Sequence, residues 1–208
     1  NPPSINQSYS YFARDGEKIS YALGAIKNVG IESMNELINE RKSNGTFKSL
    51  SDFIQRCNTS IINKKTLEAL ACAGAFDEFS INRSSVFNQA QEIVKFHKSQ
   101  NNKNLSEQED MFGDIELSHF SLNDEDEWNY PHKLMKEYEM LGFYLTGHPL
   151  EAHKINYQSF MLKEYSEIRE NETAYNQKDV LLGGTLLSKK EKRSARGNAY
   201  AFLNFSDL

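Results

Sequence analysis

The feature that most limits how this chain can fold is an acidic stretch near its middle. Nine of the 29 acidic residues lie between Asn104 and Trp128, and that stretch holds no Lys or Arg. Because like charges repel one another and resist collapse, we expect residues 99–127 to form a flexible linker or loop rather than the interior of a domain. The rest of the chain is then mildly basic, although the formal net charge of the whole is -5.

Length and composition are typical of a globular protein without a membrane span. The 208 residues, 38% of them hydrophobic, can bury a sizeable core in one or two domains. Cys57 and Cys72 provide neither a disulfide framework nor a metal-binding pair, which favours a reducing compartment, and we predict the cytoplasm. No apolar run approaches the roughly 20 residues of a membrane span, and the start lacks the features of a signal peptide. Both ends look cut, so we expect a piece of a longer protein.

The first hundred residues predict a β-hairpin followed by helices. Asp15-Gly16 lies between two apolar, Tyr-rich runs, which predicts a hairpin at about 8–23. The spacing of apolar residues and the capping residues then predict four helices: 30–41 ending at Asn44-Gly45, a short helix capped by Ser51-Asp52, another capped by Asn63 and ended by Gly74, and 83–98 capped by Asn82.

The last eighty residues predict a helical connector and then strands. An apolar stripe predicts a helix that begins behind Pro131 and ends near Gly142. From Asp179 onward two β-type runs flank the basic segment KKEKRSARGN, which we expect to be a loop between strands. Gly183-Gly184 within the first run predicts a bulge or sharp bend, as at the corner of a small barrel.

Two segments have the layout of a helix-hairpin-helix, which can grip a DNA backbone. In LGAIKNVGIESMNELI a tight turn precedes a helix, whose free backbone N–H groups can hold a phosphate, with Lys27, Asn28 and Gly30 as the contacts. An ordinary turn between packed helices is the alternative, and Glu32 would compete with a phosphate. A similar layout recurs around Gly74, with Asn82 and Arg83 at the next helix start, although this second hairpin alone reads more readily as structural.

The basic segment near the end predicts a contact with single-stranded nucleic acid. Aromatic residues such as Tyr200 and Phe202 could stack bases while the basic side chains follow the phosphates, as in an OB-fold. A solvated surface loop, with the aromatic residues facing a barrel core, is the alternative. The candidate contacts are Lys189, Lys190, Lys192, Arg193 and Arg196.

No constellation of residues predicts catalysis, a metal site or a cofactor within this chain. Asp124 and Asp126 lie in the acidic stretch and are interpreted as solvating charge. His148 and His153 lack a third ligand, so we expect core or surface histidines. Neither cysteine has a neighbouring base that would mark it as a nucleophile.

Several stretches, in order, resemble the family of bacterial replicative DNA polymerase III α subunits, the C-family polymerases. These stretches are PPSIN, YALGAIKNVG, FKSLSDF, NKKTLEALACAGAFD, NRSSV, QEDMFGD, EYEMLGFYLTGHPLEAH and LLGGTLLSKKEKRSARGNAYAFLNFSDL, and the most specific parts are LGFYLTGHPL and LEALACAGAFD. The resemblance implies a mixed, mainly α fold built of five parts: 1–23, the end of the fingers region with a β-hairpin; 24–98, a tandem helix-hairpin-helix DNA-binding domain; 99–130, an acidic linker with a clamp-binding motif; 131–175, a helical connector; and 176–208, the first strands of a truncated OB-fold.

The same resemblance implies a binding rather than a catalytic role for this piece. QEDMF is similar to the motif by which such polymerases hold the ring-shaped sliding clamp, the β subunit, with Gln108, Asp110, Met111 and Phe112 as its contacts. Double-stranded DNA, single-stranded template DNA and other replisome subunits are the further implied partners. The parent enzyme would be a DNA-directed DNA polymerase whose Mg²⁺-binding palm residues precede Asn1. The alternative is a stand-alone helix-hairpin-helix scaffold for protein assembly.

Overall fold

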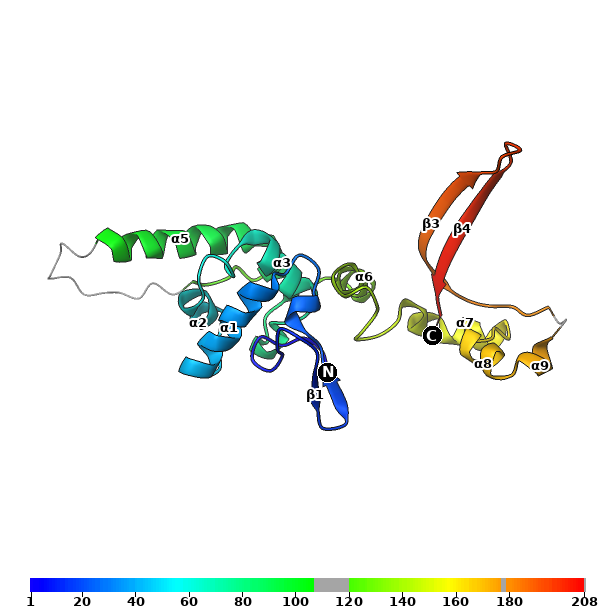
Figure 1. The fold of residues 1–208 in the computed structure, drawn as a ribbon, viewed down its shortest axis with the longest axis horizontal. Coiled ribbons are helices and arrows are strands. Elements are labelled where there is room, and N and C mark those ends of the chain that lie inside the picture. The colour runs from blue at the N-terminus through cyan, green and yellow to red at the C-terminus, as the bar shows by residue number, and fades with distance from the viewer. Residues whose placement is uncertain (107–119, 177–178, 208) are drawn as a thin grey trace. The chain divides into compact units, whose positions relative to one another are not determined.

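Figure 1 shows the computed structural model, which describes residues 1–106, 120–176 and 179–207. These residues form two compact units, Asn1–Thr146 and Gly147–Leu208, and each is described by itself. The predicted clamp-binding residues, Gln108, Asp110, Met111 and Phe112, lie outside the described residues.

The first unit begins with the expected β-hairpin, although its strands are short. Strands β1 (Ala13–Asp15) and β2 (Lys18–Ser20) pair antiparallel, with Asp15 opposite Lys18. The two-residue turn is therefore Gly16-Glu17, one residue later than predicted. Gly16 has φ 62°, a conformation that glycine adopts at no steric cost.

Helices make up most of the rest of the first unit. Two of the predicted caps are confirmed: Asn63 accepts a hydrogen bond from the backbone N–H of Thr66 (3.0 Å), and Gly142 is left-handed. The cap of the second α-helix is Ser49 rather than Ser51-Asp52, because Ser49 Oγ accepts from the N–H of Asp52 (3.2 Å). The elements are η1 (Leu23–Ala25), α1 (Ile31–Asn44), α2 (Leu50–Arg56), α3 (Lys64–Cys72), η2 (Asp77–Phe79), α4 (Arg83–Asn88), α5 (Ala90–Ser106) and α6 (Tyr130–Leu141).

The prediction of one helix over 83–98 is wrong. The chain leaves helical geometry at Gln89, which separates α4 from α5, and α5 then continues to Ser106. The side chain of Asn82 does not cap α4, because its amide donates to the backbone carbonyl of Glu125 (2.8 Å).

The core of the first unit lies among α1 to α5 and is closed by α6. Phe53 is fully buried and meets Phe47 and Phe76 edge to face, with ring centroids 5.3 and 5.2 Å apart. Such aromatic pairs add to the free energy gained by burying their area. Because α6 buries Leu134 and Leu141, the predicted connector helix packs onto the helix-hairpin-helix domain.

The expectation of a flexible acidic linker over 99–127 fails where the structure describes it. Residues 99–106 are the end of α5. Residues 120–128 run as an extended segment along α4 and α5, where the Phe120 ring meets Phe96 and the Trp128 ring meets Phe87 at 5.3 and 5.4 Å. Charge repulsion is outweighed there by the hydrogen bonds that the Glu125 and Glu127 carboxylates accept from residues 83–89.

The second unit consists of short helices and a two-stranded ribbon. Its elements are η3 (Pro149–His153), α7 (Lys154–Ser159), α8 (Tyr165–Glu170), α9 (Glu172–Tyr175), β3 (Thr185–Arg193) and β4 (Ala199–Ser206). Strands β3 and β4 pair antiparallel, and the irregularity in their register lies between Leu186 and Ser188. The bend predicted at Gly183-Gly184 thus falls a few residues later, inside β3. A Cβ on Gly183 would overlap the Tyr157 ring, whose hydroxyl donates to the Gly183 carbonyl.

The basic segment of the second unit is mostly strand rather than loop. β3 runs through Lys189, Lys190, Lys192 and Arg193, and only the turn at Ser194–Asn198, which includes Arg196, lies outside the ladder. Consecutive charged residues can form a strand here, because the side chains on both faces of this part of β3 are exposed to water.

The predicted fold class is confirmed: the described residues are mainly helical, with a β-hairpin at the start and an antiparallel strand pair at the end. Among the residues that the structure describes, no helix combines the length and apolar character that crossing a membrane requires.

Candidate nucleic-acid interface

The first hairpin, residues 26–30, joins η1 to α1 with the geometry expected from its sequence. Ile26 and Val29 are buried and anchor the turn, while Asn28 has φ 69° in the left-handed region that Asn tolerates. Lys27 is exposed, and its backbone N–H donates to the Met140 carbonyl at the end of α6 (3.0 Å). The end of α6 thus supports the hairpin through this hydrogen bond, while Lys27 and Asn28 are exposed to solvent.

The start of α1 carries no side-chain cap. Gly30 is the N-cap residue and has no side chain to cap the helix, so within the described residues the first-turn N–H groups of this 14-residue helix keep no side-chain cap, at the positive end of its dipole. Exposed Glu32 stands in this first turn, as expected from the sequence. Backbone donors of this kind can bind a phosphate without reading a base.

A glycine that sequence reasoning missed brings this hairpin together. A Cβ on Gly24 would lie 2.6 Å from the Ser10 carbonyl and 2.9 Å from Ile31 Cγ1. Only glycine lets η1 approach both the segment before β1 and the start of α1 so closely. The sequence signal was the LGA triplet before the hairpin, but the close approach involves Ser10, which lies far from it along the chain.

The second hairpin is closed by a buried arginine. Gly74 has φ 78°, and a Cβ there would overlap the Arg83 guanidinium. Arg83 is only 3% exposed and makes a bidentate pair with Asp77 (2.8 and 2.5 Å) and a longer contact with Glu137 (3.4 Å). The side chain predicted to contact DNA therefore holds the fold together instead.

The start of α4 is also occupied from within the chain. The backbone N–H groups of Arg83 and Ser84 donate to the Glu127 carboxylate at 3.1 and 3.2 Å. Partial burial works to raise the pKa of Glu127, but these N–H groups and that of Trp128 outweigh it and hold the pKa below its usual value. Asn82 is bound to Glu125, as described above. We therefore do not retain Asn82 and Arg83 as DNA contacts.

The β3–β4 ribbon presents one basic and aromatic face. Lys190 pairs with Phe202 and Lys192 with Tyr200, and directly opposed residues of an antiparallel pair share a face. Tyr200 is 44% and Phe202 58% exposed, with ring centroids 5.6 Å apart, and Lys192 Nζ lies 5.4 Å from the Phe202 centroid. This face offers what an extended single strand needs, cations for phosphates and ring faces for bases.

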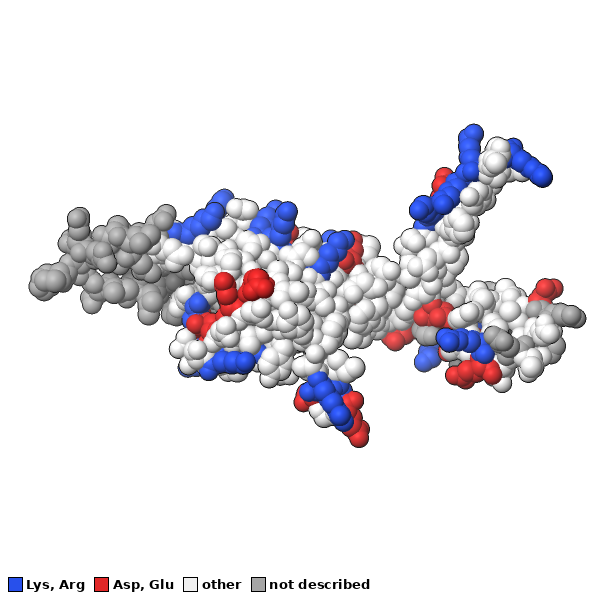
Figure 2. Space-filling model, in the orientation of Figure 1, with Lys and Arg blue, Asp and Glu red and all other residues white. Residues whose placement is uncertain are grey.

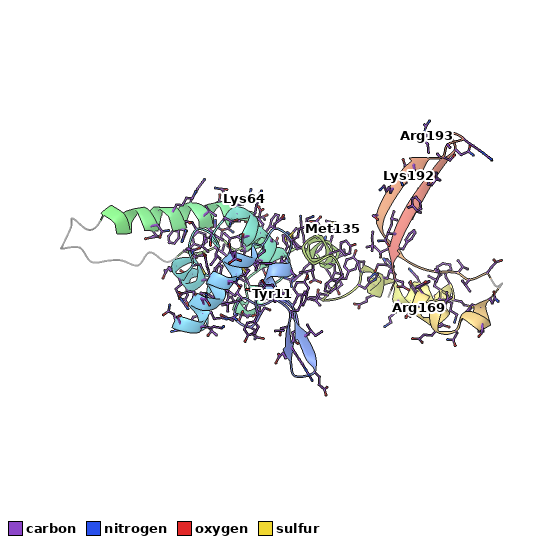
Figure 3. All side chains as sticks on the ribbon, in the orientation of Figure 1. Tyr11, Lys64, Met135, Arg169, Lys192 and Arg193 are labelled. Atoms are coloured by element: carbon purple, nitrogen blue, oxygen red, sulfur yellow. The ribbon has the colours of Figure 1, made fainter. Side chains whose placement is uncertain are left out.

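The remaining basic residues of the ribbon are placed differently. Lys189 lies on the opposite face and forms an ion pair with Glu191 (2.6 Å). Arg193 is opposite Ala199 on that same face, and Arg196 lies in the turn. Figure 2 shows Lys and Arg side chains gathered toward the outer end of the ribbon, where Figure 3 labels Lys192 and Arg193.

Comparisons with known proteins identify what the chain is similar to. A family model described as "Helix-hairpin-helix motif" matches residues 1–86. Relatives named DNA polymerase III subunit alpha match almost the whole chain, with 32% identity over 99% of it in Caulobacter vibrioides, 34% over 95% in Borreliella burgdorferi and 32% over 100% in Mycobacterium tuberculosis. The chain matches a C-terminal fragment of DNA polymerase III subunit alpha.

The match to DNA polymerase III subunit alpha confirms the resemblance that the sequence motifs indicated. The chain spans 17–18% of the length of these three relatives. The helix-hairpin-helix match covers both hairpins, although only the first leaves its second helix uncapped by a side chain in the described part of the chain.

The side chains of His148 and of both cysteines, which the sequence raised as possible chemical groups, are hydrogen-bonded or buried within the fold. His148 accepts from the N–H of Leu150 at Nδ1 (3.2 Å), so its Nε2 carries the proton and donates to Ser206 Oγ (2.7 Å). Desolvation lowers the pKa of His148, which favours this neutral form. Burial raises the pKa of both cysteine thiols, that of Cys72 to about 12, which keeps them unreactive.

Proposed function

We propose that this chain is a non-catalytic, DNA-binding and clamp-tethering segment of a replicative DNA polymerase III α subunit. Its role is to support processive DNA synthesis in the bacterial cytoplasm, within a parent that is a DNA-directed DNA polymerase using Mg²⁺ bound outside this segment. The observation that carries the DNA-binding part of the proposal is the helix-hairpin-helix match over residues 1–86. The uncapped start of α1 supports it.

Double-stranded DNA is held at the first hairpin in this proposal. The N–H groups after Gly30 bind a backbone phosphate, and exposed Lys27 adds a charge contact beside them. Glu32 reduces the local positive potential, but within the described residues no side chain caps this helix start. The second hairpin, including Gly74, supports the first from within the fold.

Single-stranded template DNA is held at the ribbon. Tyr200 and Phe202 are two residues apart on one face of β4, a rise of about 7 Å along the strand. Bases stack on these rings, and Lys190 and Lys192 follow the phosphates. The ribbon would be the first strand pair of an OB-fold.

The sliding clamp is bound by Gln108, Asp110, Met111 and Phe112 of QEDMF. Such a short segment binds weakly, around micromolar, because it loses conformational freedom on binding. Joined to the DNA contacts, the weak contact gives lasting attachment through effective concentration. Other replisome subunits would bind elsewhere on the parent protein.

The second candidate is a helix-hairpin-helix scaffold for protein assembly. Two observations favour it: Glu32 in the first turn of α1, and the closed second hairpin with its buried Arg83. A scaffold has no need of the basic and aromatic face of the ribbon, so changes on that face separate the two candidates.

Changes on the ribbon face are expected to weaken binding of a single-stranded oligonucleotide in two distinguishable ways. Lys190→Ala/Lys192→Ala should lower affinity about tenfold or more and flatten the log–log salt slope by about 1.4, because two phosphate contacts are lost. Tyr200→Ala should lower affinity by about 1–3 kcal/mol and leave the slope unchanged, because stacking is not ionic. Fluorescence anisotropy across a salt series measures both.

Lys189→Ala is the matched control, because Lys189 lies on the opposite face and is paired with Glu191. Its effect should be the smallest of the three. If all three variants bound like the unmodified chain, or if that chain bound no oligonucleotide, the ribbon would have no role in DNA binding and the scaffold would be favoured.

A further inference from the structure

Residues 120–128, which we call the strap, lie along α4, whose side chains hydrogen-bond to the backbone of the strap. The Gln89 side chain pairs twice with Asn123, accepting from its N–H and donating to its carbonyl, both at 2.8 Å. Ser84 Oγ donates to the Asp126 carbonyl (2.8 Å), and Ser85 Oγ accepts from the Glu125 N–H (3.3 Å). The side chains of Ser84, Ser85 and Gln89 thus hydrogen-bond to the backbone of the strap, as the backbone of a neighbouring β-strand does in a sheet.

The residues that bind the strap are buried, whereas the strap itself is not. Ser84, Ser85 and Gln89 are 1%, 3% and 7% exposed, and strap backbone atoms are their partners. In contrast, every strap residue keeps some exposure to solvent, including Phe120 and Leu122, which pack against the core, and Trp128. A segment with few buried apolar contacts can open locally without opening the core.

Acidic side chains add selectivity to this backbone readout. Glu125 accepts from Asn88 and Gln89, and Glu127 accepts from the start of α4 and lies 3.4 Å from Lys133 Nζ. This surface of α4 therefore suits an extended segment with carboxylates two residues apart. The strap of this chain meets that description.

We propose that the strap is a releasable latch, an acidic peptide bound in cis on the surface of α4 and α5. Released, it frees nine residues, 120–128, from their hydrogen bonds to α4. Fully extended, these nine residues span about 30 Å. Release would thereby change how far the proposed clamp motif can reach, a consequence that rests on the proposed function, whereas the latch itself does not.

Amide hydrogen exchange on the intact chain tests the latch. The Asn123 and Glu125 amides should exchange at least tenfold faster than the Leu70 and Ala71 amides in buried α3, because the strap opens without the core. Gln89→Ala should speed exchange at Asn123 at least tenfold more and leave α3 unchanged. Gln91→Ala, an exposed glutamine two residues later, is the control and should change neither.

Equal exchange rates in the strap and α3 of the unmodified chain would overturn the proposal, because the strap would then be a permanent part of the core. The same conclusion would follow if Gln89→Ala accelerated both regions alike. If Gln89→Ala does not fold, the comparison within the unmodified chain still decides. Failure of clamp binding would leave these exchange rates unaffected, so the two proposals fail separately.

Discussion

Replacing Glu137 with alanine is expected to lower the free energy of unfolding of the first unit by about 3 kcal/mol or more. The Glu137 carboxylate is fully buried and accepts from the N–H groups of Leu145 (2.7 Å) and Thr146 (2.8 Å) and from Thr146 Oγ1 (2.9 Å). It also faces Arg83 at 3.4 Å. Its removal leaves several donors without an acceptor and part of a buried cation unpaired. Urea unfolding, followed by circular dichroism, measures the loss.

The matched control is Glu139→Ala, two residues further along α6. Glu139 is 45% exposed and forms a surface ion pair with Lys136 at 3.5 Å, so its loss should cost less than about 1 kcal/mol. Equal losses in the two variants would show that the buried carboxylate does not hold α6 and the turn at 142–146 to the second hairpin.

Replacing Met111 and Phe112 together with alanine is expected to abolish detectable binding of the sliding clamp. Each side chain contributes roughly 1.5–3 kcal/mol when buried in an apolar pocket. A micromolar complex has only about 8 kcal/mol of binding free energy, so the variant would bind in the millimolar range. Calorimetric titration of clamp into both proteins measures the difference.

A second variant separates the motif from general apolar surface. Met135 and Phe143 are 48% and 43% exposed in the first unit, so Met135→Ala/Phe143→Ala removes the same two residue types elsewhere. That variant should bind clamp like the unmodified chain. A clamp titration that both variants weaken equally would assign the contact to nonspecific apolar surface rather than to QEDMF.

Local turn and cap chemistry was predictable because it depends on neighbours in sequence. Asn28, Asn63 and Gly142 adopt the roles expected of them, since each role needs only a few adjacent residues. The Ser49 cap shows the usual limit of such reasoning. Ser49 and Ser51 are two residues apart and either could cap this helix start, which the sequence places only to within one or two residues.

The errors share a different cause, which is contact between residues far apart in the chain. Arg83 was interpreted as a DNA contact although Asp77, its bidentate partner, is only six residues away; its second carboxylate contact, Glu137, lies 54 residues away. The acidic stretch was interpreted from its charge alone, yet Glu127 fits the N–H groups of α4, 44 residues earlier. Composition describes repulsion among neighbours, and it does not show which distant donors a carboxylate will meet.

The basic segment near the end was predicted as a loop and is mostly strand. Its charges suited either a loop or an exposed strand, and pairing with β4 decided for the strand. The face shared by Lys190, Lys192, Tyr200 and Phe202 follows from that register, which the sequence alone did not specify.

The most direct test of the account is the salt dependence of duplex DNA binding by the intact chain. Anisotropy titrations between 50 and 200 mM salt should give a log–log slope of about -0.9 per phosphate contacted, and Lys27→Ala should flatten it by about 0.9. Lys42→Ala, about 18 Å away near the other end of α1, should leave the slope unchanged. Binding that salt does not weaken, or no binding at all, would contradict a backbone grip at the first hairpin.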